Sequence, residues 1–411
     1  MRILLLTQVV PYPPHSGPKI KTYNVLRYLA RQHEVHLISF VRSAAEEMSL
    51  QPLRRFCTGI TAVPLRRSRS ADVAYLARSL VSGRPFLIER DNAKAMHEAA
   101  RRQAERGGFD AVHADQLSMA QFAVDLPVPL RILDEHNAVW TIVCRAASQE
   151  KSAPRRLLAE LEWRKLRAYE GAICRRFDLV TVVSGQDYVA LVDAARAVFP
   201  AHIIPIAIDT REYRFCPPAP EARGIVSVAT MFYPPNAEGV YWFASRVYPL
   251  IRRQAPEAEL YIVGSRPPRK IACLASPSSG VMVTGYVADL QPFLGRSAVW
   301  IVPVHSGSGM RVKILEAFAR GIPVVSTTVG MEGIAARDGE HLLVADEPDA
   351  FADAVLTLLR DPAEAARLAR AGRRLVEESY DWRSALNGLD AVYGRKQPVG
   401  ADSRIASEAS L

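Results

Sequence analysis

The chain has 411 residues, of which 49% are hydrophobic and 23% are charged. This length exceeds one ordinary core and fits two α/β domains, and the composition is that of a globular protein. Residues 1–200 contain 29 Lys and Arg against 20 Asp and Glu, whereas residues 201–411 contain 23 of each. A basic amino-terminal half predicts an acidic partner: a nucleic acid, an anionic membrane surface or a diphosphate-linked substrate. No nucleic-acid motif accompanies the charge, so we expect no nucleic acid partner.

The first residues, MRILLLTQVV, carry one arginine and an apolar run that is short for a signal peptide, and prolines follow at once. We therefore expect a buried parallel strand and a cytoplasmic protein. No segment approaches 18 uninterrupted apolar residues, so a transmembrane helix is not predicted. The five cysteines are scattered and show neither a disulfide framework nor zinc-ligand spacing, which indicates reduced, mostly structural thiols.

In the first half, apolar strand candidates alternate with helical segments, which is typical of a parallel sheet. The expected domain covers residues 1–210 and closes with a strand at 203–206. A proline-rich segment, 211–224, reads as a linker. The other strands are expected at 3–9, 35–40, 111–113, 131–135 and 179–184, with a helix at 20–31.

The second half repeats this alternation and predicts a second α/β domain over 225–375. A helix over 376–396 is expected to pack back on the first domain, and the small, polar tail 397–411 is expected to be disordered. Strands are expected at 225–229, 260–263, 281–284, 299–304, 322–326 and 342–345, with helices at 236–253, 348–360 and 363–378.

The most informative stretch is VWIVPVHSGSGMRVKILEAFARGIPVVST, residues 299–327. It reads as a strand, a glycine loop, an amphipathic helix and a second strand, which is one βαβ unit. Glycines 307 and 309 allow a ligand to approach the backbone, and the free amides near Met310 and Arg311 attract a phosphate. Lys313 adds a second cation, and the Glu316 carboxylate could accept hydrogen bonds from sugar hydroxyls. Glycine loops before helices are common and charged helix residues are often solvated, so the motif alone leaves both readings open.

The order G-x-G-x-R-x-K-x-x-x-E-A-x-A-x-G-x-P-V-V, residues 307–325, resembles the donor-binding segment of retaining family 4 glycosyltransferases. The resemblance implies the GT-B architecture, with two Rossmann-like doubly wound parallel-sheet domains facing a central cleft. It also implies that Glu316 holds the nucleotide ribose. The family's other glutamate position is occupied by Ser308, which is a departure. Donor-binding residues are therefore expected at Gly307, Ser308, Gly309, Met310, Arg311, Lys313 and Glu316.

In the first half, LDEHNAV places His136 and Asn137 just after a strand, where side chains of a doubly wound sheet point into a ligand crevice. A lone histidine is often structural, but His136 matches a family position beside the acceptor and donor sugar. The opening VPYPPHSGPKIKTYN resembles the family's first loop and helix, which implies that Ser16, Gly17 and Lys19 lie at the cleft. Ser184 could face the cleft or cap the next helix, and both readings stay open.

Three pieces, residues 227–243, 307–317 and 326–334, resemble sugar transferases of bacterial exopolysaccharide loci, including those associated with exosortase (PEP-CTERM) systems. Many family members place Arg and Lys after the first strand of the second domain, but residues 231–238 contain neither. We therefore expect Arg311 and Lys313 to supply that charge, with His136 and Glu316 completing the catalytic group. The chain has no Asp-x-Asp triplet, and neither a metal nor a cofactor is expected.

The resulting hypothesis is a hexosyltransferase-type glycosyltransferase. It would move a sugar from a nucleotide-diphosphate donor to a saccharide or polyprenyl-linked acceptor in exopolysaccharide biosynthesis, with retention. The arginine-rich segment 64–86 could lie on an anionic bilayer, which would place the protein at the inner face of the cytoplasmic membrane, or it could pack on its own domain. A nucleotide-sugar epimerase of the same fold and a non-catalytic saccharide-binding scaffold are the alternatives. A dinucleotide oxidoreductase is disfavoured because no G-x-G-x-x-G follows the first strand.

Overall fold

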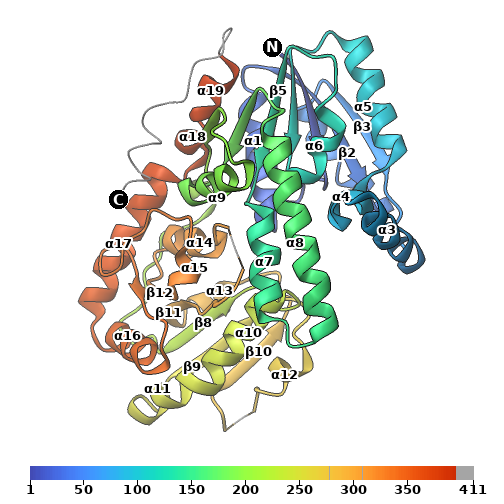
Figure 1. The fold of residues 1–411 in the computed structure, drawn as a ribbon. Helices are drawn as coiled ribbons and strands as arrows, with labels where there is room; N and C mark the ends of the chain where they lie inside the picture. The colour runs from blue at the N-terminus through green and yellow to red at the C-terminus, as the bar shows by residue number, and fades with distance from the viewer. Residues whose placement is uncertain (277, 308, 395–411) are drawn as a thin grey trace. The chain divides into compact units, whose positions relative to one another are not determined.

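The computed structural model describes residues 1–276, 278–307 and 309–394, so the predictions made for Ser308 and for the tail 397–411 lie outside the described residues. The chain divides into two compact units (Figure 1). The first comprises Met1–Ala207 together with the C-terminal segment from Trp382, and the second comprises Ile208–Asp381. The expected linker, 211–224, falls inside the second unit.

The first unit is built on a seven-stranded sheet in the order β3-β2-β1-β4-β5-β6-β7, in which all pairs are parallel. This confirms the predicted α/β class. The strands are β1 (Arg2–Thr7), β2 (Glu34–Val41), β3 (Gly59–Pro64), β4 (Ala111–Asp115), β5 (Leu130–Glu135), β6 (Leu179–Val182) and β7 (Ala201–Ile203).

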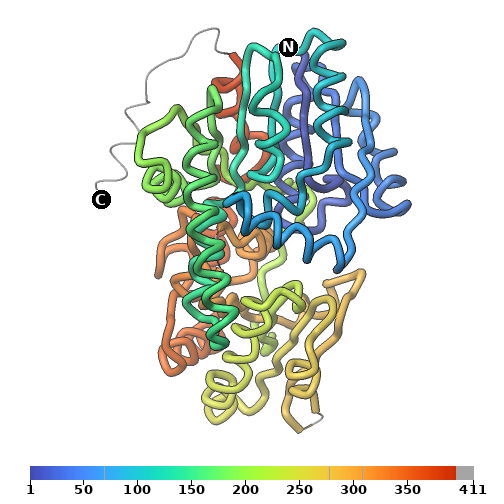
Figure 2. Tube along the Cα trace, turned by 45° about the vertical axis from the view of Figure 1, so that its right-hand side comes forward, coloured from blue at the N-terminus to red at the C-terminus, as the bar shows by residue number. Residues whose placement is uncertain are grey.

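Helices cover both faces of this sheet, because successive side chains of a strand point to opposite faces. Ile3 and Leu5 of β1 pack on one face with α1 and the C-terminal helices, whereas Leu4 and Leu6 pack on the other with α5, α6, α8 and α9. Figure 2 shows the C-terminal helices, in red, within the first unit. The helices of this unit are α1 (Gly17–Leu29), α2 (Ala44–Met48), η1 (Gln51–Arg55), α3 (Arg69–Ser82), α4 (Phe86–Asp91), α5 (Lys94–Gly107), α6 (Leu117–Ala123), α7 (Val139–Gln149), α8 (Ala153–Cys174), α9 (Gly185–Ala195), α18 (Trp382–Ala385) and α19 (Gly388–Tyr393).

Most of the expected boundaries shift by one or two residues, and three elements differ by more. Helix α1 begins three residues early, at Gly17, because Pro18 is pre-organised for a first helical turn. The strand expected at 203–206 lies at 201–203. The single helix expected over 376–396 is instead the end of α17, a break at Tyr380 and Asp381, and the short helices α18 and α19.

The second unit is built on a six-stranded sheet in the order β10-β9-β8-β11-β12-β13, again with parallel pairs. The strands are β8 (Gly224–Val228), β9 (Glu259–Val263), β10 (Val281–Gly285), β11 (Ser297–Val302), β12 (Val324–Ser326) and β13 (Leu343–Val344). The helices are η2 (Thr210–Glu212), α10 (Pro234–Trp242), the π-helical turn η3 (Phe243–Val247), α11 (Tyr248–Gln254), α12 (Arg269–Ala272), α13 (Gln291–Leu294), α14 (Val312–Arg320), α15 (Thr328–Met331), α16 (Pro348–Arg360) and α17 (Pro362–Ser379).

One face of the second sheet packs against α10, η3, α11 and α16 in a continuous apolar core. The helix expected at 236–253 is therefore the α10–η3–α11 run, which begins at Pro234. Helix α14 packs against α17, where Gly372 lets the Phe318 ring approach the helix backbone.

Both sheets reverse their strand order once, between β1 and β4 in the first unit and between β8 and β11 in the second. In open parallel sheets, ligands bind outside the carboxyl ends of the strands at such a switch point. The loops after β1, β4, β8 and β11 are therefore where binding residues are expected.

The chain passes between the units twice, at 207–208 and at 381–382. Within the second unit, hydrogen bonds join the two chain segments that lead to the first unit. The Ile208 amide donates to the Tyr380 carbonyl oxygen over 2.9 Å, and the Thr210 hydroxyl donates to Asp381 Oδ2 over 2.6 Å. In the described part of the chain, no helix has the length and apolarity that crossing a membrane requires.

Candidate functional site

In the second unit, the loop between β11 and α14 is shaped by glycines. Gly307 and Gly309 have φ of 96° and 82°, a left-handed conformation that side chains other than glycine adopt only with strain. A Cβ atom on Gly307 would lie 3.3 Å from Arg311 Nη2 and 3.4 Å from the Tyr233 hydroxyl oxygen. The loop therefore brings bare backbone close to a guanidinium and a phenol.

Arg311 and Lys313 flank the start of α14. Arg311 occupies the N-cap position, one residue before the helix begins, and its guanidinium donates to the Gly309 carbonyl oxygen. Met310 beside it is buried. The Lys313 ammonium donates to Asn236 Oδ1 over 2.8 Å, so the side chain reaches α10, the helix that follows β8. The Ile314 amide donates to the Arg311 carbonyl oxygen over 2.8 Å. The first amides of a helix in general lack a carbonyl partner within the helix and attract anions.

The charges of this group are partly removed from water. Burial, helped by the positive charge of Arg311, lowers the pKa of Lys313 to about 7. Burial raises the pKa of Glu316, whose Oε1 accepts a long hydrogen bond of 3.5 Å from the Tyr213 hydroxyl. The Arg320 guanidinium stacks 4.9 Å from the centre of the Tyr213 ring. Two cations, helix amides and a carboxylate therefore lie at the switch point of the second sheet, where an anion and a hydroxyl-bearing group could bind together.

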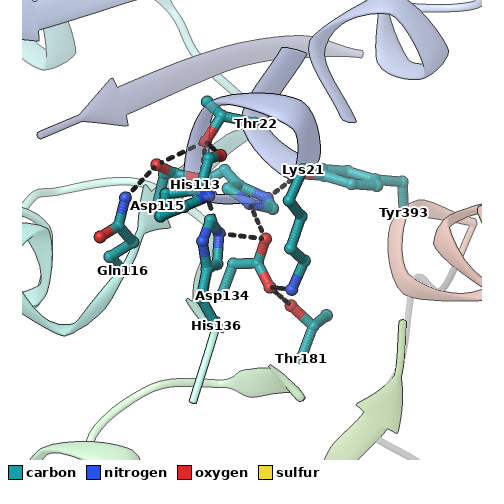
Figure 3. Close-up of polar contacts among 10 residues, drawn as sticks. Lys21, Thr22, His113, Asp115, Gln116, Asp134, His136, Thr181 and Tyr393 are labelled. Atoms are coloured by element: carbon teal, nitrogen blue, oxygen red, sulfur yellow. Dashed lines mark hydrogen bonds and ion pairs between the residues drawn. The ribbon is translucent and has the colours of Figure 1, made fainter. Parts of the chain in front are cut away.

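In the first unit, His136 belongs to a buried network at the carboxyl ends of β4 and β5 (Figure 3). Its Nε2 atom lies 3.0 Å from Asp115 Oδ1 and 3.5 Å from Asp134 Oδ2. Asp134 Oδ1 accepts from the Lys21 ammonium and from the Thr181 hydroxyl, each over 2.6 Å. The other ring nitrogen of His136, Nδ1, is buried and has no hydrogen-bond partner within the described residues.

The network extends to the C-terminal helix α19. The Tyr393 hydroxyl lies 2.7 Å from His113 Nδ1, and His113 Nε2 lies 3.5 Å from Asp134 Oδ2. Burial, and then the negative charge of Asp134, raise the pKa of the Tyr393 phenol, so the phenol stays protonated and donates to Nδ1. The other ring nitrogen of His113, Nε2, faces Asp134.

Charge balance explains why this network can be buried. Burial alone would raise the pKa of Asp134, but Lys21 and hydrogen bonds from His113 and His136 hold it well below its ordinary value. Burial alone would lower the pKa of His136, but Asp115 and Asp134 raise it above 6.5. The negative charges of Asp115 and Asp134 are therefore balanced by the Lys21 ammonium and by the protonated form of His136, which the two carboxylates stabilise.

The loop that carries His136 is fixed by two further buried carboxylates. Glu170 of α8 accepts from the amides of Val139 and Trp140 over 2.6 and 2.9 Å. Asp187 accepts from the Ala138 amide over 3.0 Å. These contacts hold the start of α7 and with it the position of His136.

Among the described residues, Asp115, Asp134 and His136 are the one group whose ligand atoms lie close enough to hold a metal. The donor set does not suit a resident divalent ion, because Lys21 already neutralises Asp134 and His136 is hydrogen-bonded to Asp115. A divalent ion here would add charge beside a buried ammonium. The group fits an ion-pair network.

The remaining predicted residues of the first unit lie at or next to the starts of α1, α7 and α9. Ser16 is exposed, and its carbonyl oxygen accepts from the Ile20 amide over 2.8 Å; Gly17 opens α1. Lys19 and Asn137 are half-buried. Ser184 caps α9 by accepting from the Asp187 amide over 3.2 Å.

Sequence reasoning missed several residues that the fold brings together. Asp115 is the last residue of β4 and Lys21 lies in α1. Nothing local marks Asp115 as the partner of His136, or Lys21 as the partner of Asp134. Asn236 could have been suspected, because it lies near the start of the helix that follows β8. Tyr393 and His113 are 280 positions apart, and no local signal joins them.

Two Rossmann-like domains, each with polar side chains at the switch point of a parallel sheet, define the GT-B fold. Anabaena HepE in complex with UDP and glucose shares this fold, with a TM-score of 0.67 and 13% identity over 96% of this chain and 99% of HepE. Sucrose-phosphate synthase of Thermosynechococcus elongatus matches with a TM-score of 0.68 and 19% identity, over 96% and 98% of the two chains.

Residues 222–361 match the family described as Glycosyl transferases group 1. An uncharacterized 44.6 kDa protein in the cps region of Klebsiella pneumoniae is 20% identical over 94% of this chain and 98% of its own. A GDP-mannose-dependent alpha-(1-6)-phosphatidylinositol monomannoside mannosyltransferase of Mycolicibacterium smegmatis is 26% identical over 69% and 83%. The chain is a glycosyltransferase of the GT-B type.

Proposed function

We propose that the protein transfers a hexose from a nucleoside-diphosphate sugar to a saccharide or polyprenyl-linked acceptor during the synthesis of an extracellular polysaccharide. The observation that carries the proposal is the group formed by the glycine loop, Arg311, Lys313 and Glu316 in the domain that matches Glycosyl transferases group 1. HepE, which shares the fold, binds UDP and glucose, and the Klebsiella relative comes from a cps region.

The chemistry of transfer explains the residues. Breaking the bond between the sugar and the diphosphate leaves negative charge on the nucleoside diphosphate, and preorganised cations and helix amides stabilise that charge. Arg311, Lys313 and the first amides of α14 would provide this stabilisation without a metal. Glu316 would accept hydrogen bonds from the ribose, and His136 would orient a sugar through its unused Nδ1 atom. Retention of the anomeric configuration is part of the proposal and rests on the sequence resemblance.

The membrane part of the proposal rests on α3. Val73, Leu80 and Val81 are exposed on this helix, at 68%, 56% and 91% of their surface, and Arg78 lies on the same helix. An amphipathic helix with exposed apolar and basic residues suits the surface of an anionic bilayer. Val81→Asp should weaken co-sedimentation with anionic vesicles, and high salt should weaken it further.

The donor site is tested by calorimetry of the purified protein against UDP, GDP, ADP and TDP and their sugars. Arg311→Ala, Lys313→Ala and Glu316→Ala should each weaken binding of the preferred nucleotide by about tenfold or more, the cost of a charge-assisted hydrogen bond. Arg337→Ala and Glu340→Ala, which break an exposed ion pair in the same domain, are the matched controls. A folded wild type that binds no nucleotide would overturn the proposal in favour of a scaffold.

Turnover separates the enzyme classes. A transferase should release nucleoside diphosphate in step with acceptor, whereas an epimerase would convert the sugar without any acceptor. Proton NMR of the product gives the anomeric configuration. Dialysis against EDTA should leave the rate unchanged, and a loss restored by a divalent ion would contradict the metal-independent part of the proposal.

A further inference from the structure

Three arginines of the first unit gather around one buried carboxylate. Arg67 forms an ion pair with Asp91 Oδ1, and Arg90 Nε lies 3.5 Å from the same oxygen. The Asp91 side chain is 1% exposed, and its Oδ2 accepts from the side-chain Nε2 of Gln8 over 2.6 Å. Arg42 joins the group because its Nη2 donates to the Gln8 carbonyl oxygen over 3.1 Å.

The positive charges in this cluster exceed the negative ones. Arg42 has only a loose pair with Glu46, at 3.9 Å between Nη1 and Oε1, and its Nε is buried without a hydrogen-bond partner in the part of the chain that the structure describes. Burial, and then the charge of Arg67, lower the pKa of Arg42. Asp91 and Glu46 thus face three guanidiniums, and the Lys19 ammonium also interacts with Arg42 and Glu46. Like charges at this density repel one another, and an added anion would relieve the repulsion.

The cluster lies where a ligand is expected. Gln8, Arg42 and Arg67 follow β1, β2 and β3, so they share the carboxyl edge of the sheet, the edge at which doubly wound sheets bind ligands. The side chains of Arg42, Arg67 and Arg90 keep 26%, 33% and 23% of their surface exposed. They are therefore partly desolvated and still accessible to a small anion.

The apolar surface of α3 adjoins the cluster along the chain. Helix α3 begins two residues after Arg67, and it packs against α4, which carries Arg90 and Asp91. The exposed Val73, Leu80 and Val81 lie on α3. An anion held by the arginines could thus be the head of a molecule whose hydrocarbon part follows α3.

We propose that Arg42, Arg67 and Arg90 form a binding site for the phosphate or diphosphate group of a lipid-linked acceptor, which competes with Asp91 for the guanidiniums. The planar guanidinium forks give paired hydrogen bonds to phosphate oxygens, and a second and third arginine supply the charge that Asp91 does not neutralise. This inference rests on the proposed transfer to a lipid-linked acceptor, but the site itself is defined by binding alone.

The test measures binding of farnesyl diphosphate and of inorganic diphosphate by calorimetry. All variants are made in the full chain carrying Arg311→Gln and Lys313→Gln, so that anions at the second unit do not contribute. Arg67→Gln should weaken binding by about tenfold, as loss of one charge-assisted pair predicts. Asp91→Asn keeps an acceptor for Gln8 but removes the competing charge, so it should tighten binding by several-fold. Arg102→Gln, an exposed arginine on α5, is the matched control and should change nothing.

The Asp91 variant separates a ligand site from a structural ion-pair network. If the arginines served only to neutralise Asp91, Asp91→Asn would lower thermal stability without tightening diphosphate binding, and the proposal would be overturned. Farnesyl diphosphate binding that exceeds inorganic diphosphate binding supports a lipid-linked ligand. Binding to anionic vesicles that follows the arginines, with no response to either diphosphate, would reassign the cluster to membrane headgroups and overturn the acceptor site. Because none of these readouts needs a donor or turnover, they stand apart from a failure of the transferase proposal.

Discussion

Lys313 shows how one side chain can couple ligand binding to pH. Its pKa is lowered to about 7 by burial and by Arg311, and its partner Asn236 carries no charge. The free protein therefore holds this lysine partly neutral near neutral pH. A bound diphosphate would favour the ammonium, so binding must take up a proton when the pH exceeds about 7.

We expect the affinity for the preferred nucleoside diphosphate to fall as the pH rises from 7 to 9, by up to about tenfold per pH unit when one proton is taken up. Calorimetry in buffers of different ionisation enthalpy measures both the affinity and the proton uptake. Lys313→Arg keeps the charge at every pH and should flatten the dependence. A wild type whose proton uptake is zero at pH 8 would contradict this assignment.

Glu135 makes the stability of the first unit, rather than ligand binding, depend on pH. Both of its carboxylate oxygens are buried without hydrogen-bond partners among the described residues. Burial, and then the charges of Glu170 and Asp134, raise its pKa well above the ordinary value of 4.5. The folded chain therefore binds more protons than the unfolded chain. The proton on Glu135 therefore contributes to the free energy of unfolding. This contribution is fully present below pH 4.5 and is lost as the pH rises through the raised pKa of the folded chain.

Glu135→Gln replaces this carboxyl with a neutral group of the same shape, and it should raise the melting temperature at pH 8.5 while leaving it nearly unchanged near pH 5. A gain of 1 kcal/mol corresponds to about 2–4 °C for a unit of this size. Thermal unfolding by circular dichroism at both pH values measures the difference. Glu98→Gln, which breaks an exposed pair with Lys94, should show no such pH dependence. Equal shifts in both variants would rule out burial as the cause.

At the scale of elements, the two switch-point loops of the second sheet depend on close backbone packing. Gly239 of α10 lies so close to the end of β11 that a Cβ atom would collide with the Pro303 carbonyl oxygen and lie 3.3 Å from Val304 Cα. This close packing places Asn236, about one helical turn before Gly239, within hydrogen-bond distance of Lys313 in α14.

Gly239→Ala should push α10 away from this loop, lower the stability by about 1–3 kcal/mol as overpacking does, and weaken nucleotide binding by breaking the contact between Asn236 and Lys313. Denaturant unfolding and calorimetry measure the two effects. Gly185→Ala in α9 is the control, because a Cβ atom there meets nothing within 4 Å. If the Gly239 variant were destabilised but bound nucleotide normally, nucleotide binding would not depend on the position of α10.

The sequence predicted elements well where a pattern is local. β1 and β11 are buried on both faces, so their apolar runs are continuous and easily recognised. β3 is an edge strand with only Val63 buried, and its pattern is too weak to stand out. Helix α8 buries few of its 22 residues and exposes leucines, so its apolar periodicity is blurred.

The candidate site divides in the same way. Gly307, Arg311, Lys313 and Glu316 are close in sequence, and their gathering was predictable from helix geometry. The contact between Lys21 and Asp134 spans 113 positions and depends on which strands become neighbours. Such contacts follow from strand order, which a single sequence without internal repeats does not reveal.

At the scale of the whole molecule, the end of the chain completes the first unit. After the second unit, the segment that contains α18 and α19 adds five large side chains to an apolar core of the first unit: Trp382, Leu386, Leu389, Val392 and Tyr393. The Arg27 guanidinium stacks 4.4 Å from the centre of the Trp382 ring. Tyr393 also reaches the buried network of His136 through His113. The first unit is therefore not a contiguous stretch of sequence, and its stability depends on residues that follow the whole second unit.

A chain that ends after Asp381 should lose this core contribution, since burying one large apolar side chain is worth about 1.5–3 kcal/mol and five are removed. We expect its first unit to unfold near room temperature or to aggregate, while the second unit, which retains Ile208–Asp381, keeps its own melting transition. A chain that ends after Gly394 retains every one of these contacts and is the control. Differential scanning calorimetry of the two shortened chains and the full chain resolves the transitions. If the chain ending at Asp381 kept the full-length melting profile, the returning helices would be dispensable for the first unit.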